Sequence, residues 1–237
     1  MIELGLGLLS IGRPWGHRRQ APPSEPDAFA LLEKATALGI RFFDTAPAYG
    51  SSEAILGRFL RETGATAVVS TKMGEWWDGE SGVSTVDHRY DALARSIDCS
   101  LERLGRIDLL QIHKATASNL VSRDVSRAID YARQCGVQHF GASVSDVAAA
   151  QAARQTGWCS YLQFPFNQAN TALAPIFHLG LKNIINRPLA MGAIQSSAQA
   201  FAFIRGQPFD GVVLTGTKSV AHLVENHAAF YARSLQD

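Results

Sequence analysis

The chain has 237 residues, of which 46% are hydrophobic and 18% are charged, and its formal net charge is +1. This balance is typical of a globular protein with a sizeable core, and it excludes the strong positive charge that attracts nucleic acid or anionic membranes. No apolar run approaches the ~20 residues that a membrane-spanning helix needs, and Glu3 interrupts the first apolar stretch, which favours an N-terminal strand over a signal peptide.

The cysteines and histidines give no sign of a metal site or a disulfide framework. Cys99, Cys135 and Cys159 form no CxxC pair, and the seven histidines form no HExxH or HxH motif. We therefore expect no bound metal, and we expect the thiols to be structural. Such thiols are typical of a reducing compartment, which predicts a cytoplasmic location.

Short apolar segments rich in β-branched or aromatic residues alternate along the chain with longer segments of helical periodicity. Most of the short segments are almost entirely apolar, as expected for strands that are covered on both faces of a parallel sheet. The predicted strands, in chain order, are Glu3–Leu8, Arg41–Asp44, Ala67–Thr71, Leu109–His113, His139–Ala142, Tyr161–Phe164, Asn183–Asn186 and Gly211–Leu214.

A helix is predicted after each of these strands from apolar spacing and from residues that begin or end helices. In the first of them, for example, Leu31, Leu32 and Ala35 share one face and Gly39 follows the end. The predicted helices are Asp27–Leu38, Ser52–Arg61, Thr85–Leu104, Leu120–Gln134, Asp146–Gln155, Ala172–His178, Ser196–Ile204 and Ser219–Ala232.

Eight alternating β and α units predict an α/β fold, a closed (β/α)8 TIM barrel, with residues 1–237 in a single domain. An open, doubly wound sheet is the alternative. In the predicted first strand, however, Gly5-Leu6-Gly7 is not followed by a third glycine and a helix, so the dinucleotide-binding fingerprint is incomplete. In a barrel of this type the chemistry takes place where the strands end.

Four polar side chains lie at the ends of three consecutive predicted strands. Asp44 ends the second strand, Tyr49 follows it by five residues, Lys72 follows the third strand and His113 ends the fourth. A tyrosine has an unperturbed pKa of about 10, so its phenolate needs a nearby cation to form near neutral pH. We expect Lys72 to supply that cation, Asp44 to keep it charged, and His113 to orient the reacting oxygen. The pattern predicts hydride transfer between a carbonyl and an alcohol, with Tyr49 as general acid or base.

The segment Gly39–Gly50, with its Asp-Thr-Ala-x-x-Tyr-Gly pattern, resembles the first signature of the aldo-keto reductase family. Val69–Lys72 resembles the family's lysine strand, and Asp108–His113 resembles its histidine strand. The resemblance covers nearly the whole chain. It implies an NAD(P)(H)-dependent oxidoreductase acting on a small aldehyde, ketone, aldose or alcohol, with the four residues above as its catalytic tetrad.

The resemblance also implies a nicotinamide site. Ser143 and Gln163 resemble the serine and glutamine that hold the nicotinamide carboxamide in the family. Val144 stands where most members have an asparagine, so one hydrogen bond to the carboxamide is expected to be missing or to come from elsewhere. Asn167 resembles a family residue that follows the sixth strand.

Two further segments resemble the phosphate-binding parts of the family. Asn186–Gly192 is similar to the loop on the pyrophosphate side, where Arg187 can form charge-assisted bonds to phosphate. Gly216–Asn226 is similar to the adenosine-phosphate site, at the start of a helix whose free N–H groups favour an anion. His222 stands where many members have an arginine that binds the 2′-phosphate, so NADP is the expected cofactor and NAD is the alternative. The cofactor residues implied here are Arg187, Leu189, Gly192, Gly216, Thr217, Lys218, Ser219, His222, Glu225 and Asn226.

Loops after the predicted first and third strands carry three tryptophans, and we expect these to line the substrate pocket: Trp15, Trp76 and Trp77. We expect the basic residues between them to form a solvated turn: His17, Arg18 and Arg19. Compared with typical members, the chain has no hairpin before its first strand, little in Ala190–Gly211 and no C-terminal loop. The expected result is an open site with weak cofactor retention, a broad or bulky substrate range, and a monomer or weak homo-oligomer.

Two other functions fit the same sequence. The first is a nicotinamide-binding regulatory or partner subunit with little turnover of its own. The second is a non-redox barrel enzyme such as an isomerase, in which the matches to the phosphate site and to Gln163 would be coincidences.

Overall fold

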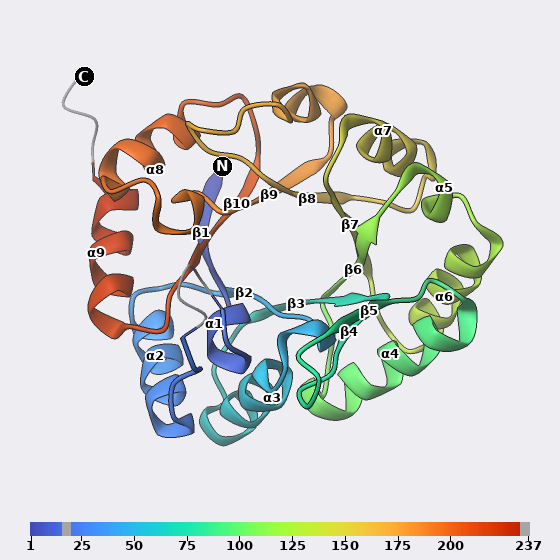
Figure 1. Ribbon diagram of the computed structural model, residues 1–237, viewed down its shortest axis with the longest axis horizontal. Helices are drawn as coiled ribbons and strands as arrows, with labels where there is room; N and C mark the ends of the chain where they lie inside the picture. The colour runs from blue at the N-terminus through green and yellow to red at the C-terminus, as the bar shows by residue number, and fades with distance from the viewer. Residues whose placement is uncertain (16–19, 233–237) are drawn as a thin grey trace.

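The computed structural model describes residues 1–15 and 20–232. Eight parallel strands close into a barrel in the order β1-β10-β9-β8-β7-β6-β3-β2, which confirms the predicted TIM barrel (Figure 1). The barrel strands are β1 (Ile2–Gly7), β2 (Phe42–Asp44), β3 (Val68–Met73), β6 (Leu109–Ala115), β7 (His139–Val144), β8 (Tyr161–Pro165), β9 (Lys182–Asn186) and β10 (Gly211–Gly216).

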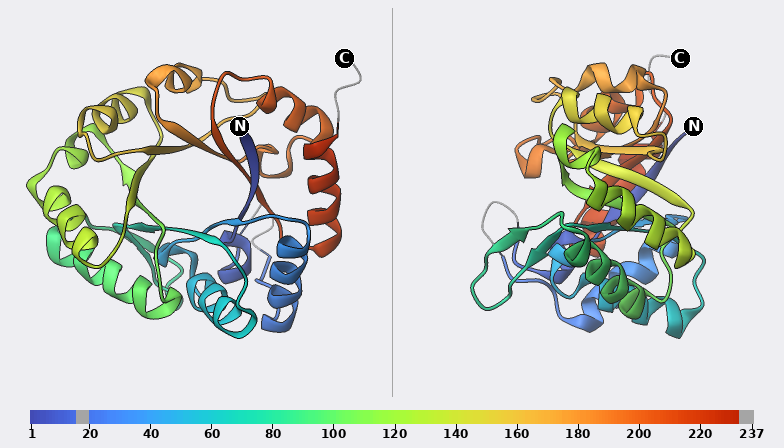
Figure 2. Two further views of the ribbon diagram at one scale, coloured as in Figure 1. Left: turned by 180° about the vertical axis from the view of Figure 1, so that it is seen from behind. Right: turned by 90° about the vertical axis from the view of Figure 1, so that its right-hand side faces the viewer.

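Helices surround the barrel on its outside, as both faces of the molecule show (Figures 1 and 2). The longer helices are α2 (Glu25–Ala37), α3 (Ser52–Thr63), α4 (Tyr90–Leu104), α6 (Arg123–Gln134), α7 (Val147–Gln155), α8 (Ser197–Arg205) and α9 (Val220–Tyr231). Short helical turns lie in the connections: α1 (Leu9–Gly12), η1 (Pro47–Tyr49), α5 (Ala117–Leu120), η2 (Ala174–Leu179) and η3 (Ala190–Gly192).

The prediction of a helix over Thr85–Leu104 is wrong at its start. Its first two residues, Thr85 and Val86, belong to β5 (Ser84–Val86), which forms an antiparallel hairpin with β4 (Glu75–Trp77). The β-branched residues of β5 favour a strand, and Asp87 N–H then donates to the Gly74 carbonyl over 3.0 Å, which closes the hairpin before the helix begins.

Two other predicted helices differ in detail. The predicted helix over Leu120–Gln134 is interrupted, because the Ser122 side chain accepts a hydrogen bond from Val125 N–H and caps a new helix, α6. The predicted helix Ala172–His178 is the 3-10 helix η2 instead.

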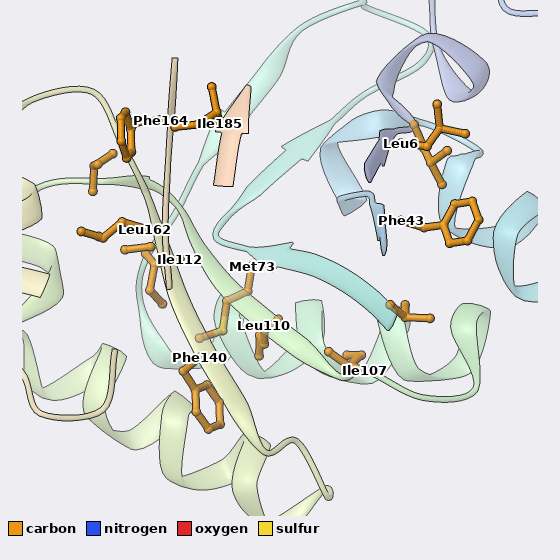
Figure 3. Packing of buried hydrophobic residues seen from close by; sticks show 14 of the residues in the cluster. Leu6, Phe43, Met73, Ile107, Leu110, Ile112, Phe140, Leu162, Phe164 and Ile185 are labelled. Atoms are coloured by element: carbon orange, nitrogen blue, oxygen red, sulfur yellow. The ribbon is translucent and has the colours of Figure 1, made fainter. Parts of the chain in front are cut away.

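Alternate residues of each strand face the barrel interior or the surrounding helices. The outward side chains form the main core between sheet and helices, as Leu110, Ile112 and Phe140 do in Figure 3. The inward side chains near the amino ends of the strands form a smaller apolar cluster: Phe42, Leu109, Ile184, Val212 and Leu214.

Along the same strands, the inward positions become polar toward the carboxyl ends. Phe42 is followed at the next inward position by Asp44, and Leu109 is followed by Gln111 and then by His113. The strand pattern itself therefore separates an apolar floor from a polar mouth, and the predicted catalytic residues lie at the mouth.

The structure also bears on the expectations about membrane spans, metal ligands and the basic turn. No helix in the described part of the chain has the length and apolarity needed to cross a bilayer. Within residues 1–15 and 20–232, no three His, Cys, Asp or Glu side chains are grouped as metal ligands would be. The basic turn predicted at His17, Arg18 and Arg19 lies outside the described residues.

Candidate active site

The structure brings the four predicted catalytic side chains together at the mouth of the barrel. Asp44 ends β2, Lys72 lies on β3 and His113 lies on β6, while Tyr49 ends η1 directly after β2. Lys72 Nζ lies 2.6 Å from Asp44 Oδ2 and 4.8 Å from the centroid of the Tyr49 ring. The Tyr49 and His113 rings meet edge to face, with their centroids 5.9 Å apart.

A tight loop holds Tyr49 over the other three residues. Gly50 has φ +62°, and a Cβ at this position would lie within 2.3 Å of the Gly12 carbonyl oxygen, so a side chain is excluded. Ser51 N–H donates to that same carbonyl over 3.1 Å. The Thr45 and Ser52 hydroxyls are hydrogen-bonded at 2.6 Å, which joins the start of the loop to the start of α3.

The Asp44 carboxylate is 2% exposed and accepts four hydrogen bonds from three neighbouring strands. Besides Lys72, the donors are Gln163 Nε2 to Oδ2 at 3.1 Å, Gln111 Nε2 to Oδ1 at 3.1 Å, and Ser70 Oγ to Oδ1 at 3.3 Å. A buried carboxylate requires such partners. Asp44 is therefore fixed in position by strands β3, β6 and β8.

The site holds one firmly charged cation. Burial by itself would lower the pKa of Lys72, but the Asp44 carboxylate and the Tyr49 side chain together outweigh it, and the pKa lies above its ordinary value. Lys72 Nζ also donates to the Thr45 carbonyl over 2.9 Å. The ammonium is thus retained at neutral pH although its side chain is only 1% exposed.

The Tyr49 phenol remains protonated. Burial raises the pKa of Tyr49, and the neighbouring Lys72 ammonium opposes this increase without cancelling it. The expected stabilisation of the phenolate by Lys72 is therefore present, but burial outweighs it. The phenol is in the form that a general acid requires.

His113 lies where β6 bends out of register with β7. The pairing shifts between Ile112 and Ala115, and Lys114 has φ +52°. Burial lowers the pKa of His113, so the ring is neutral at pH 7. Its Nδ1 lies 3.0 Å from Glu75 Oε2 of the β4–β5 hairpin.

Three site residues escaped the sequence interpretation. Ser70 and Gln111 lie two positions before Lys72 and His113 on their strands, and strand alternation would have placed them on the same inward face. Glu75 carried no such signal, because its position depends on a hairpin that the sequence did not reveal.

The two residues predicted to hold a carboxamide lie side by side. Ser143 of β7 and Gln163 of β8 are partners in the strand register. Gln163 donates its amide N–H to Asp44, while its Oε1 is buried and has no partner in the described residues. An unpartnered buried acceptor fits the N–H of a carboxamide. Val144, by contrast, is 3% exposed and is part of the hydrophobic core.

Asn167 shapes the loop after β8. Its Nδ2 donates to the Arg187 carbonyl over 2.9 Å, and its Oδ1 accepts from Ala169 N–H over 3.0 Å. Both ends of the amide are therefore used within the protein. The hydrogen bond to Arg187 ties the loop after β8 to the loop after β9.

The segments predicted to bind phosphate lie beside each other, because β9 and β10 are paired. In the loop after β9, Arg187, Ala190 and Met191 all have positive φ, at 56°, 47° and 58°. Non-glycine residues rarely adopt this conformation, and such strain is concentrated at functional sites. Leu189 and Gly192 lie in the same loop, and Arg187 is exposed.

The loop after β10 leads directly into α9. Ser219 caps this helix by accepting from His222 N–H over 3.3 Å, and Thr217 Oγ1 accepts from Ser219 N–H over 3.0 Å. Lys218 Nζ donates to the Ala21 carbonyl over 2.8 Å. Gly216 is exposed at the end of β10, so the loop is open to the mouth.

The first turns of α9 differ in their accessibility. His222 and Glu225 are exposed. Asn226 is 8% exposed, and its Nδ2 donates to Thr215 Oγ1 over 2.9 Å. Its amide nitrogen is thus bonded to β10, and the contact of Asn226 with an adenine ring stays a prediction.

A cavity of about 1310 Å³ opens between the two sides of the mouth. Arg13, Trp15 and Trp77 line one side, and Gly192 and His222 line the other. Arg13 Cζ lies 5.6 Å from the Trp15 ring centroid and 5.5 Å from that of Trp77. The cavity therefore connects the side of the mouth predicted to bind substrate with the side predicted to bind the cofactor.

The tetrad side chains lie beyond the lining of this cavity. A Cβ on Gly50, next to Tyr49, would come within 3.1 Å of Trp77 Cζ3, so Trp77 lies between the cavity and the tetrad loop. Trp76 points to the other face of β4 and is not part of the lining.

A closed parallel barrel with titratable groups at the carboxyl ends of its strands is the arrangement of barrel enzymes. The model of the aldo/keto reductase family matches residues 3–200. The chain belongs to the aldo/keto reductase family.

Individual relatives agree with this assignment. A pyridoxal 4-dehydrogenase from Microbacterium luteolum is 38% identical over 140 residues, which cover 48% of this chain and 40% of the relative. The chain therefore matches less than half of the length of that protein. A solved structure from Pseudomonas aeruginosa, described as an aldo-keto reductase, has a TM-score of 0.83 at 28% identity and covers 96% of this chain and 88% of its own.

A more distant solved structure shares the fold. An aldo/keto reductase from Klebsiella pneumoniae, solved in complex with NADP and acetate, has a TM-score of 0.74 at 21% identity. The likeness covers 98% of this chain and 87% of that chain.

Proposed function

We propose that the protein is an NAD(P)(H)-dependent oxidoreductase that interconverts a small carbonyl compound and its alcohol, with Tyr49 as general acid or base. The observation that carries this proposal is the contact between Tyr49, Lys72 and Asp44 at the mouth of the barrel. Membership of the aldo/keto reductase family supports it.

Each residue of the tetrad has a distinct role in the proposed reaction, and that of His113 is to orient the reacting oxygen. In reduction, negative charge develops on the carbonyl oxygen, and the Tyr49 hydroxyl donates its proton there. Lys72 stabilises the resulting phenolate, and Asp44 holds the ammonium in place. In oxidation, the phenolate of Tyr49 accepts the proton of the alcohol.

The proposed cofactor is NADP, with NAD as the alternative. A bound nicotinamide supplies or accepts the hydride. Ser143 and the free Oε1 of Gln163 would hold its carboxamide. The phosphates would lie along the loops after β9 and β10, near Arg187 and the first turn of α9.

The remaining predicted cofactor residues lie along the same two loops. Leu189 and Gly192 would border the pyrophosphate, and Gly216, Thr217, Lys218, Ser219, His222, Glu225 and Asn226 would border the adenosine part. Four of these are used within the protein, since Thr217 accepts from Ser219 N–H, Lys218 bonds to Ala21, Ser219 caps α9 and Asn226 bonds to Thr215. Of these four, Lys218 is the one that can most readily exchange its partner for phosphate, because its bond is to a single exposed carbonyl.

The cavity lined by Trp15 and Trp77 is the proposed entrance for the substrate. Indole rings favour apolar or ring-shaped groups. The name of the Microbacterium relative, a pyridoxal 4-dehydrogenase, fits a ring-bearing substrate of this kind. We therefore include pyridoxal with aliphatic aldehydes, ketones and aldoses as candidate substrates.

A single assay tests the proposal. The protein is mixed with NADPH or NADH and a panel of carbonyl substrates, and the absorbance of the reduced nicotinamide is followed. We expect turnover that the Tyr49→Phe change abolishes, while Tyr231→Phe, a change on the exposed part of α9, leaves it intact. Tight NADPH binding without turnover of any substrate would instead indicate a regulatory or partner subunit.

A further inference from the structure

The Arg13 guanidinium is held by two indole rings at the wall of the cavity, and the proposed proton transfer does not use it. Its Cζ lies 5.6 Å from the centroid of the Trp15 ring and 5.5 Å from that of Trp77. All three residues line the cavity. A guanidinium is attracted to the face of an indole, so the cation is held in place before any ligand binds.

The segments that carry the two indoles are themselves anchored. Trp15 N–H donates to the Gln20 carbonyl over 3.4 Å, and Trp77 pairs with Ser84 across the β4–β5 hairpin. Arg13 Nη1 donates to Ser84 Oγ over 3.2 Å. Arg13 therefore joins the segment after β1 to the hairpin, and both parts determine where its charge lies.

Most of the hydrogen-bonding capacity of Arg13 is left for a ligand. A guanidinium has several N–H donors and no acceptor. Within residues 1–15 and 20–232, the bond to Ser84 is the one hydrogen bond that its side chain makes, and it forms no ion pair there. Because the half-buried side chain lines the cavity, its remaining donors are available to a molecule bound there.

Arg13 lies next to the loop that holds the proton donor. The backbone of Gly12 packs so closely against the Tyr49 carbonyl oxygen that a Cβ on Gly12 is excluded. On the other side, the Trp77 ring lies beside Gly50, where a Cβ would come within 3.1 Å of it. The part of a substrate that extends from Tyr49 into the cavity therefore passes Arg13.

The charges around Arg13 favour a ligand with a single negative charge. Burial lowers the pKa of Arg13 while Glu75 and Tyr49 raise it, and an arginine stays protonated in proteins. Among the described residues that line the cavity, Glu80 is the acidic one, and it is exposed, so solvent screens its charge. One cation with Glu75 nearby balances a carboxylate better than a phosphate ester, which carries about −1.5 to −2.

We propose that Arg13 binds a carboxylate on the substrate, so that the protein interconverts aldehyde or keto acids and the corresponding hydroxy acids. This proposal rests on the proposed function, since it concerns the substrate of the same reaction. The two oxygens of a planar carboxylate match the paired N–H groups of a guanidinium. The indoles of Trp15 and Trp77 would border the apolar part of such a substrate.

The first test compares 4-formylbenzoate with 4-formylbenzamide, and the two 3-formyl compounds in the same way, with NADPH as the reductant. The members of each pair have nearly the same shape and differ in charge. We expect Arg13→Met to lower kcat/KM for the carboxylates by about 10- to 100-fold, the effect of charge-assisted hydrogen bonds, and for the amides far less. No loss, or an equal loss, on the two members of both pairs would overturn the proposal.

A matched control removes the same charge elsewhere. Arg95 is exposed on α4, and Arg95→Met should leave kcat/KM for acid and amide unchanged. Arg13→Lys keeps the charge and the stem but not the paired donors, so it should retain part of the preference for the acid. A loss in Arg95→Met as large as that in Arg13→Met would show general attraction of anions and overturn the proposal.

The second test needs neither turnover nor cofactor. Benzoate and benzamide are titrated into the protein, and binding is followed by tryptophan fluorescence, since Trp15 and Trp77 adjoin Arg13. We expect benzoate to bind about 10-fold more tightly than benzamide, and Arg13→Met to remove the difference. Equal binding of the two in the unchanged protein, or a preference that survives in Arg13→Met, would overturn the proposal.

Two further measurements separate the carboxylate from other oxyanions. The dissociation constant of NADPH should be the same in Arg13→Met as in the unchanged protein. A loss of NADPH affinity as large as the kinetic effect would assign Arg13 to the cofactor instead. A preference for glyceraldehyde 3-phosphate over glyceraldehyde that depends on Arg13, without one for the formylbenzoates, would likewise overturn the carboxylate class.

The two proposals fail in different ways. If the protein turns over no carbonyl compound, the proposed function is wrong, while the titration with benzoate still decides whether Arg13 binds a carboxylate. Turnover of acid and amide that responds equally to Arg13→Met would overturn the role of Arg13 alone.

Discussion

The Lys72 ammonium lies 2.6 Å from the Asp44 carboxylate, and both side chains are almost completely excluded from solvent. A buried ion pair is weak evidence for stability, because the desolvation of both charges offsets their attraction. Removing one partner is a different matter, since it leaves the other charge buried and uncompensated. This asymmetry makes the pair a sensitive point for both stability and activity.

Asp44→Asn should lower the free energy of unfolding by about 3–5 kcal/mol, because the Lys72 charge then lacks its counterion. Urea unfolding measures this directly. Asp210→Asn is a matched control, since Asp210 is 56% exposed in its pair with the N-terminus and should change the value far less. Similar losses in the two variants would show that burial of the Asp44–Lys72 pair has no energetic consequence.

Lys72→Met should reduce kcat by several orders of magnitude while leaving the barrel folded, because three other hydrogen bonds to the Asp44 carboxylate remain. The buried methionine removes the cation that stabilises the Tyr49 phenolate. The rate and a circular dichroism spectrum, recorded on the same sample, check both statements. An unchanged rate would contradict the role of Tyr49 as proton donor.

Stability should decrease between pH 7.5 and pH 5.5 because of His113. Burial lowers the pKa of His113 in the folded protein, whereas in the unfolded chain it titrates near the ordinary value of about 6.5. As the pH falls through this value, the unfolded chain takes up a proton that the folded ring does not, so the unfolded state gains stability. The midpoint of urea unfolding should therefore decrease, and His113→Asn should weaken this dependence.

Glu53→Ala should lower the free energy of unfolding by about 3 kcal/mol. Glu53 has no exposed surface and accepts from Thr71 Oγ1 at 2.6 Å, Ser100 Oγ at 2.8 Å and Arg103 Nη1 at 3.0 Å. The residue thereby joins α3 to β3 and α4. Glu62 lies on the same helix and its side chain is 58% exposed, so Glu62→Ala should have little effect on the free energy of unfolding. Equal losses of stability in the two variants would refute the importance of the buried network.

His222→Arg should tighten the binding of NADPH by about 10-fold or more and leave the binding of NADH nearly unchanged. The reason is that an exposed guanidinium on the first turn of α9 can form charge-assisted bonds to the 2′-phosphate, which only NADPH carries. Quenching of tryptophan fluorescence gives both dissociation constants. Val224→Arg adds the same charge to the exposed face of α9 and serves as the control. A gain shared by both nucleotides, or by both variants, would indicate general electrostatic attraction only.

The barrel, and the meeting of the four predicted catalytic side chains at its mouth, could be predicted because both depend on regular patterns. Asp44, Lys72 and His113 each lie at or near the carboxyl end of an apolar strand, and parallel strands bring such ends to one mouth. Ser143 and Gln163 follow the same rule, and their register pairing agrees with it. The alternation of side chains along a strand is a local property, so it can be predicted from the sequence alone.

Contacts between distant irregular segments could not be predicted in the same way. The second strand of the hairpin that carries Glu75 overlaps the start of the helix predicted over Thr85–Leu104, so the helical pattern concealed the hairpin. Likewise, the bond between Asn226 and Thr215 depends on the angle at which α9 packs against β10. Such angles arise from the packing of the whole barrel rather than from local spacing.

The apolar cluster at the amino ends of the strands has a kinetic consequence. Phe42, Leu109, Ile184 and Val212 are each at most 6% exposed and close the barrel from below. In the proposed reaction, nucleotide and substrate would then exchange through the same mouth, so the ligand that reaches deeper toward Gln163 would arrive first and depart last. Steady-state kinetics should consequently follow an ordered sequence, with dissociation of the deeper ligand able to limit the overall rate.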